Sequence, residues 1–194
     1  MAKQQGQGNR SVPVVLILAA GRGERFLRSG GTGSKLNASL AGISVLQRVE
    51  ATVAASGLAH ITVRQADGSG MGDTIAAGVR QTAQAPGWLV LPGDLPLISP
   101  ATLQAVARQL EAGRVVVPWV GQTPAHPVGF PSECGPLLAA LTGEHGARGI
   151  VKELRGLGRV MDMQVADRGA IMDVDTQEDL DAVREVLRQA ADGA

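Results

Sequence analysis

The sequence predicts an α/β fold of the Rossmann-like three-layer type, in which a mostly parallel sheet lies between two layers of helices. Short apolar runs rich in β-branched residues alternate along the chain with segments whose apolar residues recur at helical spacing. The 194 residues, 44% of them hydrophobic, suffice for one such domain with a single core. We therefore assign residues 12–194 to one domain, preceded by a flexible, polar N-terminus at residues 1–11.

Local signals place the elements of this fold. Ser99 and Pro100 are typical of a helix start, Gly57 of a helix end, and Thr176 with Asp179 has the spacing of a capping box. The expected strands are 12–18, 61–63, 88–91, 115–120, 127–130 and 160–165, with another at Ile171. The expected helices cover 45–53, 71–83, 99–113, 137–141, 147–154 and a last segment from 176.

The composition excludes several classes of protein. Lys plus Arg and Asp plus Glu number 18 each, which argues against broad nucleic-acid binding, since that usually requires a basic surplus. Cys134 is the only cysteine, so neither an internal disulfide nor a four-cysteine metal site is available. No run approaches the ~18 apolar residues of a membrane span, and the N-terminus lacks a signal-peptide run. We expect a soluble cytoplasmic protein that binds no membrane.

The first strand leads into a glycine-rich segment suited to phosphate. Small residues there let backbone N–H groups approach a phosphate closely, and two cations, Arg25 and Lys35, follow. A tight turn is the alternative interpretation. A Walker loop does not fit, because the sequence lacks four residues between a glycine and a Gly-Lys-Ser/Thr sequence. A dinucleotide fingerprint does not fit either, because Phe26 stands in the place of its third glycine. The predicted nucleotide-binding residues are Leu18, Ala19, Ala20, Gly21 and Gly23.

Two acidic positions follow predicted strands. Asp94 comes after the strand at 88–91, where a carboxylate can hold Mg²⁺ either directly or through water. Its alternative role is in a turn or as a helix cap. Asp173 and Asp175 lie on one side of an extended segment, so one of them can be the second metal ligand. We name Asp175 with Asp94 as metal candidates, although Asp175 can instead cap the last helix.

Two further segments are candidates for ligand contact. Gly70, Met71, Gly72 and Asp73 open a helix whose N-terminus can face a nucleotide, or Asp73 can simply complement the helix dipole. The second segment precedes and includes a short strand, where a lone histidine is either structural or in contact with an acceptor. An arginine further along either holds a phosphate or is solvated. The acceptor-site candidates are His126, Pro127, Gly129 and Arg148.

Together these blocks resemble the molybdenum-cofactor nucleotidyltransferases, a MobA-like group of NTP transferases. The blocks are Leu18-Ala-Ala-Gly21 with Arg25 and Lys35, Gly70-Met-Gly72, Pro92-Gly-Asp94-Leu-Pro96, His126-Pro-Val-Gly-Phe130 with Gly146-Ala-Arg148, and Asp173-Val-Asp175-Thr176 with Glu178-Asp179-Leu180. They occur in family order over residues 14–187. The chain is most similar to the cytidylyltransferases, because the guanylyl branch usually has Gly-Gly at Ala19-Ala20.

This resemblance implies a fold of the nucleotide-diphospho-sugar transferase type, Mg²⁺ as cofactor, CTP as donor and molybdopterin as phosphorylated acceptor. It assigns Gly21, Arg25 and Lys35 to the triphosphate, Asp94 to Mg²⁺ and the His126 segment to the acceptor. A molybdoenzyme would receive the product. The chain departs from the family in a longer loop between Phe26 and Lys35, and in a strand–helix unit that we expect to be missing before Gly70.

The expected chemistry is attack of an acceptor phosphate oxygen on the α-phosphorus, with release of pyrophosphate. The attacking phosphate is ionised at neutral pH, so catalysis would come from positioning and charge stabilisation by Asp94-bound Mg²⁺, Arg25 and Lys35. Two alternatives stay open from the sequence. One is transfer of another nucleotide to a sugar phosphate or similar metabolite, and the other is a nucleotide- or cofactor-binding protein without turnover.

Overall fold

A seven-stranded mixed sheet forms the centre of the molecule. The computed structural model describes residues 12–21, 23–64, 70–110 and 113–192. The strand order is β4-β1-β5-β8-β6-β7, with β9 paired to β6. Only β8 and β7 run antiparallel to their neighbours, so the predicted mostly parallel sheet is confirmed. The strands are β1 Val14–Leu18, β4 His60–Val63, β5 Gly87–Pro92, β6 Val115–Val120, β7 Thr123–Pro124, β8 Val128–Pro131 and β9 Val160–Gln164.

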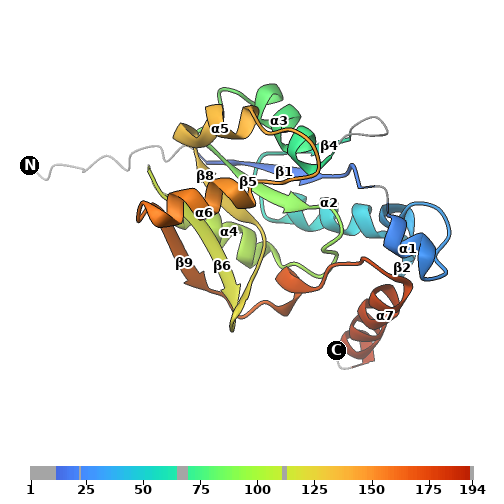
Figure 1. Cartoon of the computed structure of the whole chain (residues 1–194). Helices are drawn as coiled ribbons and strands as arrows, with labels where there is room; N and C mark the ends of the chain where they lie inside the picture. The colour runs from blue at the N-terminus through green and yellow to red at the C-terminus, as the bar shows by residue number, and fades with distance from the viewer. Residues whose placement is uncertain (1–11, 22, 65–69, 111–112, 193–194) are drawn as a thin grey trace, which may run out of the picture.

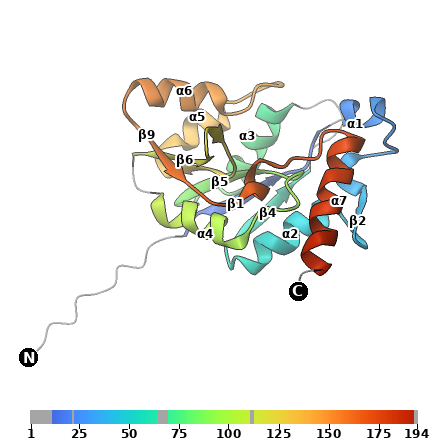
Figure 2. The same cartoon turned by 90° about the horizontal axis from the view of Figure 1, so that it is seen from below.

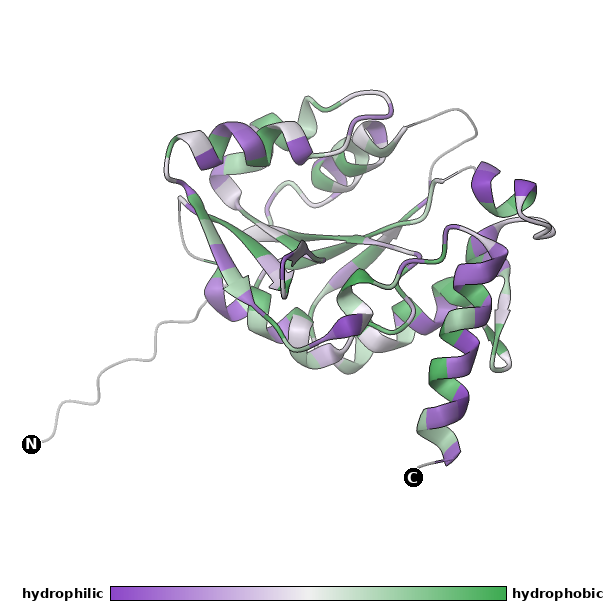
Figure 3. Cartoon of the chain, turned by 60° about the horizontal axis from the view of Figure 1, so that its bottom comes forward, coloured by the Kyte–Doolittle hydropathy of each residue, from purple (hydrophilic) through white to green (hydrophobic). Residues whose placement is uncertain are grey.

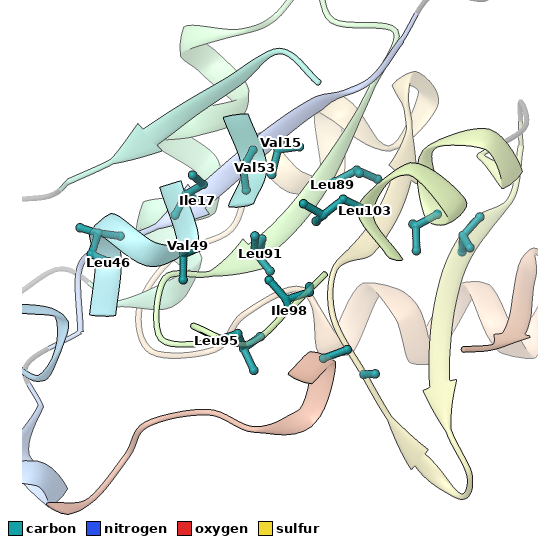
Figure 4. Packing of buried hydrophobic residues seen from close by; sticks show 14 of the residues in the cluster. Val15, Ile17, Leu46, Val49, Val53, Leu89, Leu91, Leu95, Ile98 and Leu103 are labelled. Atoms are coloured by element: carbon teal, nitrogen blue, oxygen red, sulfur yellow. The ribbon is translucent and has the colours of Figure 1, made fainter. Parts of the chain in front are cut away.

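Helices cover both faces of this sheet (Figures 1 and 2). Helices α2 (Val45–Ala55) and α4 (Pro100–Gln109) pack on one face, and their apolar side chains meet those of β1 and β5 (Figure 4). Helices α3 (Met71–Gln81), α5 (Gly135–Ala139) and α6 (Arg148–Gly156) pack on the other face. Alternate residues of β1 serve the two layers, because successive side chains of a strand point to opposite faces.

A third apolar cluster lies beside the sheet and joins segments from the first and last quarters of the chain. Helix α1 (Glu24–Arg28) contributes Phe26, and the small hairpin β2 (Ser39–Leu40) and β3 (Ile43–Ser44) contributes Leu40. The long helix α7 (Gln177–Asp192) packs Leu180 and Val183 against them. Figure 3 shows the alternating polar and apolar stripes of this helix, an amphipathic pattern that buries one side only.

Most predicted elements are present, and the differences lie in the shortest ones. The strand expected at Ile171 is wrong, because the 3₁₀ turn Arg168–Ile171 occupies its place and an extended loop follows. Helix α1 and the β2–β3 hairpin were not predicted, since five and two residues are too few to show a hydrophobic period. The cap at Ser99 is confirmed, with its hydroxyl accepting from the Thr102 amide at 3.2 Å.

None of the helices in the part of the chain that the structure describes has both the length and the apolar character to cross a bilayer. The predicted polar N-terminus at residues 1–11 lies outside the described residues.

Candidate active site

A cleft of about 830 Å³ opens at the carboxyl ends of β1 and β5. The two strands are parallel neighbours that pair Leu18 with Pro92, so the loops that follow them leave the sheet at the same edge. The Gly93 amide donates to the Leu18 carbonyl at 2.9 Å, which holds the two loops together. The predicted site residues that line the cleft are Leu18, Ala20, Gly21, Gly23, Arg25, Lys35, Met71, Asp94, His126 and Asp175.

Lys35 is at the centre of a cluster of charges in this cleft. Its Nζ lies 2.6 Å from Asp94 Oδ2 and 2.6 Å from Asp175 Oδ1. Asp175 Oδ2 also accepts from Arg25 Nη1 at 2.8 Å. The structure thus brings together the three predicted catalytic residues and both predicted metal ligands, although they lie up to 150 residues apart in the sequence.

Lys35 follows the long loop after Phe26, but its own position is fixed by packing. It begins the 3₁₀ turn Lys35–Asn37, and its side chain is only 11% exposed. Leu36, the next residue, is buried in the same cluster as α2 and β1. The packing of this turn fixes where the Lys35 side chain starts, so only its flexible methylene stem is free to move the ammonium group.

Asp175 reaches the cluster because other residues cap the last helix. Asp179 Oδ2 accepts from the Thr176 amide at 2.7 Å, and the Asp179 amide donates to Thr176 Oγ1 at 3.1 Å, which is the predicted capping box. The segment before the helix is held against Asp94 by a hydrogen bond from the Val174 amide to the Asp94 carbonyl, 2.9 Å long. The Asp175 carboxylate is therefore available for Lys35 rather than for capping.

The charges of the cluster shift its pKa values in opposite directions. Burial, with the nearby Asp94 charge, raises the pKa of Asp173. Burial acts in the same direction on Asp175, but Lys35 and Arg25 outweigh it and lower the pKa of that carboxyl. For Lys35 burial favours the neutral amine, yet Asp94 and Asp175 prevail and raise its pKa. At neutral pH Lys35 is thus an ammonium group.

The donor set fits a divalent metal ion that is shared with a phosphate ligand. Asp94 Oδ1 is buried and has no hydrogen-bond partner within the part of the chain that the structure describes. Asp94, Asp173 and Asp175 carry three negative charges against the two positive charges of Lys35 and Arg25. No three acidic, histidine or cysteine side chains of the described residues form a complete metal cage. Mg²⁺ usually takes one or two carboxylates and completes its shell with water and substrate phosphates, so a partial site is sufficient.

His126 lines the cleft on the side of β7. Its backbone amide donates to the Ala170 carbonyl at 3.1 Å, and its Nδ1 is buried without a partner among the described residues. Burial lowers the pKa of His126, an effect that Asp94 and a hydrogen bond to the Val90 backbone oppose and Arg148 reinforces, so the imidazole is neutral at pH 7. A neutral imidazole carries one donor and one acceptor nitrogen, and Nδ1 is the one left without a partner among the described residues.

The other predicted acceptor residues lie outside the cleft lining. Gly129 lies within β8, where a Cβ would be 3.1 Å from Val106 on α4, so packing accounts for this glycine. Pro127 is buried beside it, joined to His126 by a cis peptide bond. Arg148 begins α6 with its side chain exposed. For these three, contact with an acceptor stays a prediction.

The predicted nucleotide segment at the start of α3 is divided between packing and the cleft. A Cβ on Gly70 would overlap the backbone at Gly143, and one on Gly72 would lie 2.6 Å from the His145 carbonyl oxygen. Asp73 Oδ2 accepts from the Gly70 amide at 3.1 Å and from the Gly143 amide at 2.9 Å. These residues hold the 142–145 loop against α3, whereas Met71 faces the cleft.

Several residues that line the cleft were not predicted as site residues. Thr123 and Pro124 come from the β7 hairpin, which is too short to be recognised from the sequence. Asp173, the alternative to Asp175 as second metal ligand, lines the same cleft. The local sequence around these residues does not indicate that they line a cleft, because the cleft forms only when distant loops meet. The remaining unpredicted lining residues are Glu24, Arg28, Leu36, Thr74, Pro92, Gly93, Leu95, Glu144 and Ile171. Ala19 packs against the core, and its contact with nucleotide stays a prediction.

Asp175→Asn is expected to lower the unfolding temperature at neutral pH, with a deficit that shrinks in acid. The folded-state pKa of Asp175 lies below the ordinary 3.8. Its ion pairs therefore stabilise the fold fully above that ordinary value, and this contribution is lost as the pH falls through the folded-state pKa. Thermal unfolding of both proteins at about pH 7, 5 and 3 measures the deficit. Asp181→Asn on the exposed face of α7 is the control, and a deficit unchanged at the lowest pH contradicts the assignment.

Comparison with known proteins agrees with this architecture. Residues 50–159 match the family model described as the MobA-like NTP transferase domain. The purine catabolism protein PucB of Bacillus subtilis is 33% identical over 122 residues, which are 61% of this chain and 58% of PucB. The chain thus spans less than two thirds of that relative.

Solved structures share the fold at lower identity. A nucleotidyl transferase from Methanothermobacter, Mth528, superposes with a TM-score of 0.79 at 17% identity, over 92% of this chain and 99% of that one.

Two further structures are similar. Rv0371c of Mycobacterium tuberculosis, solved in complex with manganese, superposes with a TM-score of 0.64 at 21% identity, over 90% of this chain and 99% of that one. A molybdopterin-guanine dinucleotide biosynthesis protein A from Archaeoglobus fulgidus superposes with a TM-score of 0.61 at 19% identity, over 91% of this chain and 99% of that one. These structural similarities show the fold alone. The family is shown by the family model, which matches more than half of the chain. The chain belongs to the MobA-like NTP transferase domain family.

Proposed function

We propose that the protein is a Mg²⁺-dependent nucleotidyltransferase that transfers CMP from CTP to the phosphate of molybdopterin and releases pyrophosphate. The observation that carries this proposal is the convergence of Lys35, Asp94, Asp175 and Arg25 beside the glycine-rich loop after β1. A triphosphate and its metal ion need this combination of backbone amides, cations and carboxylates in one cleft.

The residues of the cleft have separable roles in this reaction. An acceptor phosphate oxygen attacks the α-phosphorus, the new P–O bond forms, and the electron pair of the breaking α–β P–O bond leaves on pyrophosphate. Lys35 and Arg25 neutralise the charge that gathers on the leaving group, and the amides of the 18–23 loop hold the phosphates. Asp94 and Asp175 would hold Mg²⁺, which supplies Lewis-acid polarisation of the phosphoryl oxygens when it is bound.

His126 is proposed to face the acceptor. It lies in the cleft near the β7 hairpin, away from the glycine-rich loop in the sequence, and its buried Nδ1 lacks a partner among the described residues. A buried polar atom of this kind is stabilised when a ligand supplies the missing hydrogen bond. The pterin ring system of molybdopterin carries such donors and acceptors.

The choice of CTP rests on Ala19 and Ala20, where guanylyl enzymes of the resembling family have glycines. GTP is the main competitor, since the similar Archaeoglobus protein is named for a guanine dinucleotide. The name of PucB connects the relative with purine catabolism, and a molybdoenzyme is the partner that we propose for the product. Transfer to a sugar phosphate is the second candidate, because the charge cluster recognises a triphosphate whatever the acceptor.

The test is pyrophosphate release from CTP, GTP, ATP and UTP with Mg²⁺, with and without molybdopterin. The proposal expects release that requires the acceptor and is fastest with CTP. Release from GTP alone would keep the enzyme class and overturn the base assignment. Release that requires a sugar phosphate would overturn the acceptor. Nucleotide binding without release under every condition would indicate a binding protein instead.

A further inference from the structure

The ammonium group of Lys35 occupies the position between two carboxylates that a metal ion would need. Its Nζ is 2.6 Å from an oxygen of Asp94 and 2.6 Å from an oxygen of Asp175, the two residues proposed to hold Mg²⁺. We propose that Lys35 holds the place of the metal in the nucleotide-free protein, so that a divalent ion binds strongly only together with the triphosphate. This inference rests on the proposed function, which identifies the metal–nucleotide ligand.

Charge and burial both prevent the Lys35 ammonium group and a divalent metal ion from occupying this position at the same time. The side chains of Lys35 and Asp94 are 11% and 16% exposed, so water screens this cluster poorly. A divalent ion that entered while the ammonium stayed would share its oxygens and repel it at short range. Conversely, loss of the ammonium alone would leave Asp94, Asp173 and Asp175 close together with one remaining cation, Arg25, on the exposed side.

The triphosphate provides the means of moving Lys35. Lys35 lines the same cleft as Ala20, Gly21 and Gly23, where the phosphates are proposed to lie. Its backbone is held by the 3₁₀ turn and by the burial of Leu36, whereas the side chain is a flexible four-carbon stem carrying a point charge. A rotamer change is therefore enough to transfer the ammonium from the carboxylates to a phosphate, with no movement of the main chain.

Asp94 is already prepared for the exchange. Lys35 contacts only its Oδ2, while its buried Oδ1 has no hydrogen-bond partner in the described chain. An unsatisfied buried carboxylate oxygen raises the free energy of the nucleotide-free state. When the metal enters with the triphosphate, both Asp94 oxygens can gain cationic or water partners, and Asp175 keeps a partner in the metal.

Manganese binding to the full chain tests this inference directly. Mn²⁺ serves as the probe because the electron paramagnetic resonance of the free ion reports binding without any turnover, and the Mn²⁺ bound by each analogue in the absence of protein is subtracted. The proteins are the wild type, Lys35→Met and, as the matched control, Lys152→Met, whose lysine is exposed on α6. Each is titrated alone and with non-hydrolysable α,β-methylene analogues of CTP and GTP.

The wild type is expected to bind Mn²⁺ at least about tenfold more tightly with an analogue than without, since the phosphates draw Lys35 away. Lys35→Met is expected to bind Mn²⁺ without nucleotide at least about tenfold more tightly than the wild type, because the competing charge is gone. Lys152→Met should match the wild type. Mn²⁺ should also raise the unfolding temperature of Lys35→Met more than that of the wild type.

Two results would overturn the inference. One is a Lys35→Met protein that is folded by circular dichroism yet binds Mn²⁺ no more tightly than the wild type. The other, which decides the case even when Lys35→Met does not fold, is a wild type that binds Mn²⁺ equally well with and without analogue. Pyrophosphate release is measured separately, so a protein that shows the expected metal binding but no turnover contradicts the proposed function alone.

Discussion

Asp94→Ala is expected to reduce kcat for pyrophosphate release by about 100-fold or more, the range seen when a preorganised charge contact is removed. Asp94 is held after β5 by its neighbours, with its carbonyl accepting from the Val174 amide at 2.9 Å and its carboxylate bonded to Lys35. The substitution removes the better-buried of the two proposed metal ligands. It also leaves Lys35 with Asp175 as its only carboxylate partner in the cluster.

The measurement is steady-state release of pyrophosphate at limiting and saturating Mg²⁺. Because the remaining Asp175 binds the metal weakly by itself, part of the lost rate should return at high Mg²⁺. Asp181→Ala, on the exposed surface of α7, is the matched control and should retain normal turnover. Near-normal turnover of Asp94→Ala at limiting Mg²⁺ would show that Asp94 is not a metal ligand.

Gly169→Ala is expected to destabilise the fold by about 3 kcal/mol and to lower activity, although Gly169 does not line the cleft. A Cβ at this buried glycine would overlap the Leu97 carbonyl oxygen and lie 2.8 Å from the Ile98 amide nitrogen. Both neighbours are backbone atoms, which cannot yield by a simple rotamer change. The chain from Gly169 onward would have to move, and that chain carries Asp173 and Asp175.

The contact at Gly169 is reinforced by Asp167. Its Oδ2 accepts from the Ser99 amide at 2.9 Å, and its Oδ1 accepts from the Gly169 amide at 3.0 Å. The segment between β9 and α7 is thereby attached to the loop between β5 and α4. A displacement at Gly169 is therefore expected to move the Asp175 carboxylate relative to Lys35 and Asp94.

Urea unfolding and pyrophosphate release measure the two effects of Gly169→Ala. The control is Gly149→Ala in the first turn of α6, where a Cβ meets nothing within 4 Å. That variant should keep its activity and either retain its stability or gain up to about 1 kcal/mol from the higher helix propensity of alanine. An unchanged unfolding midpoint for Gly169→Ala would show that the 97–98 loop can move aside at little cost.

The fold class follows from patterns that local physics imposes. Short, continuous apolar runs rich in β-branched residues, such as 12–18 and 88–91, are typical of strands buried on both faces, and the helical spacing between them predicts the covering helices. The sequence predicts Asp94 as a candidate site residue because polar residues after buried parallel strands gather at one edge of the sheet. The helix caps at Ser99 and Thr176 could also be predicted from the sequence, since each depends on two residues three positions apart.

The partners of these residues were decided by tertiary structure. Lys35 looked like a loop residue, because nothing nearby in the sequence indicates that Leu36 packs in the core or that Asp94 and Asp175 lie within 2.6 Å of the ammonium. The glycines at 70 and 72 are predicted nucleotide contacts, and only the tertiary structure shows that the distant 142–145 loop takes the space for a side chain there.

By itself, then, the sequence determined the layers of the fold, the edge of the sheet that carries the site and most of the charged residues there. It did so because hydrophobic period, capping and strand ends act over a few residues. Only the tertiary structure decided that Asp175, next to the capping box predicted at Thr176 and Asp179, bonds to Lys35 and Arg25. That choice depends on the close approach of segments up to 150 residues apart, which packing alone brings about.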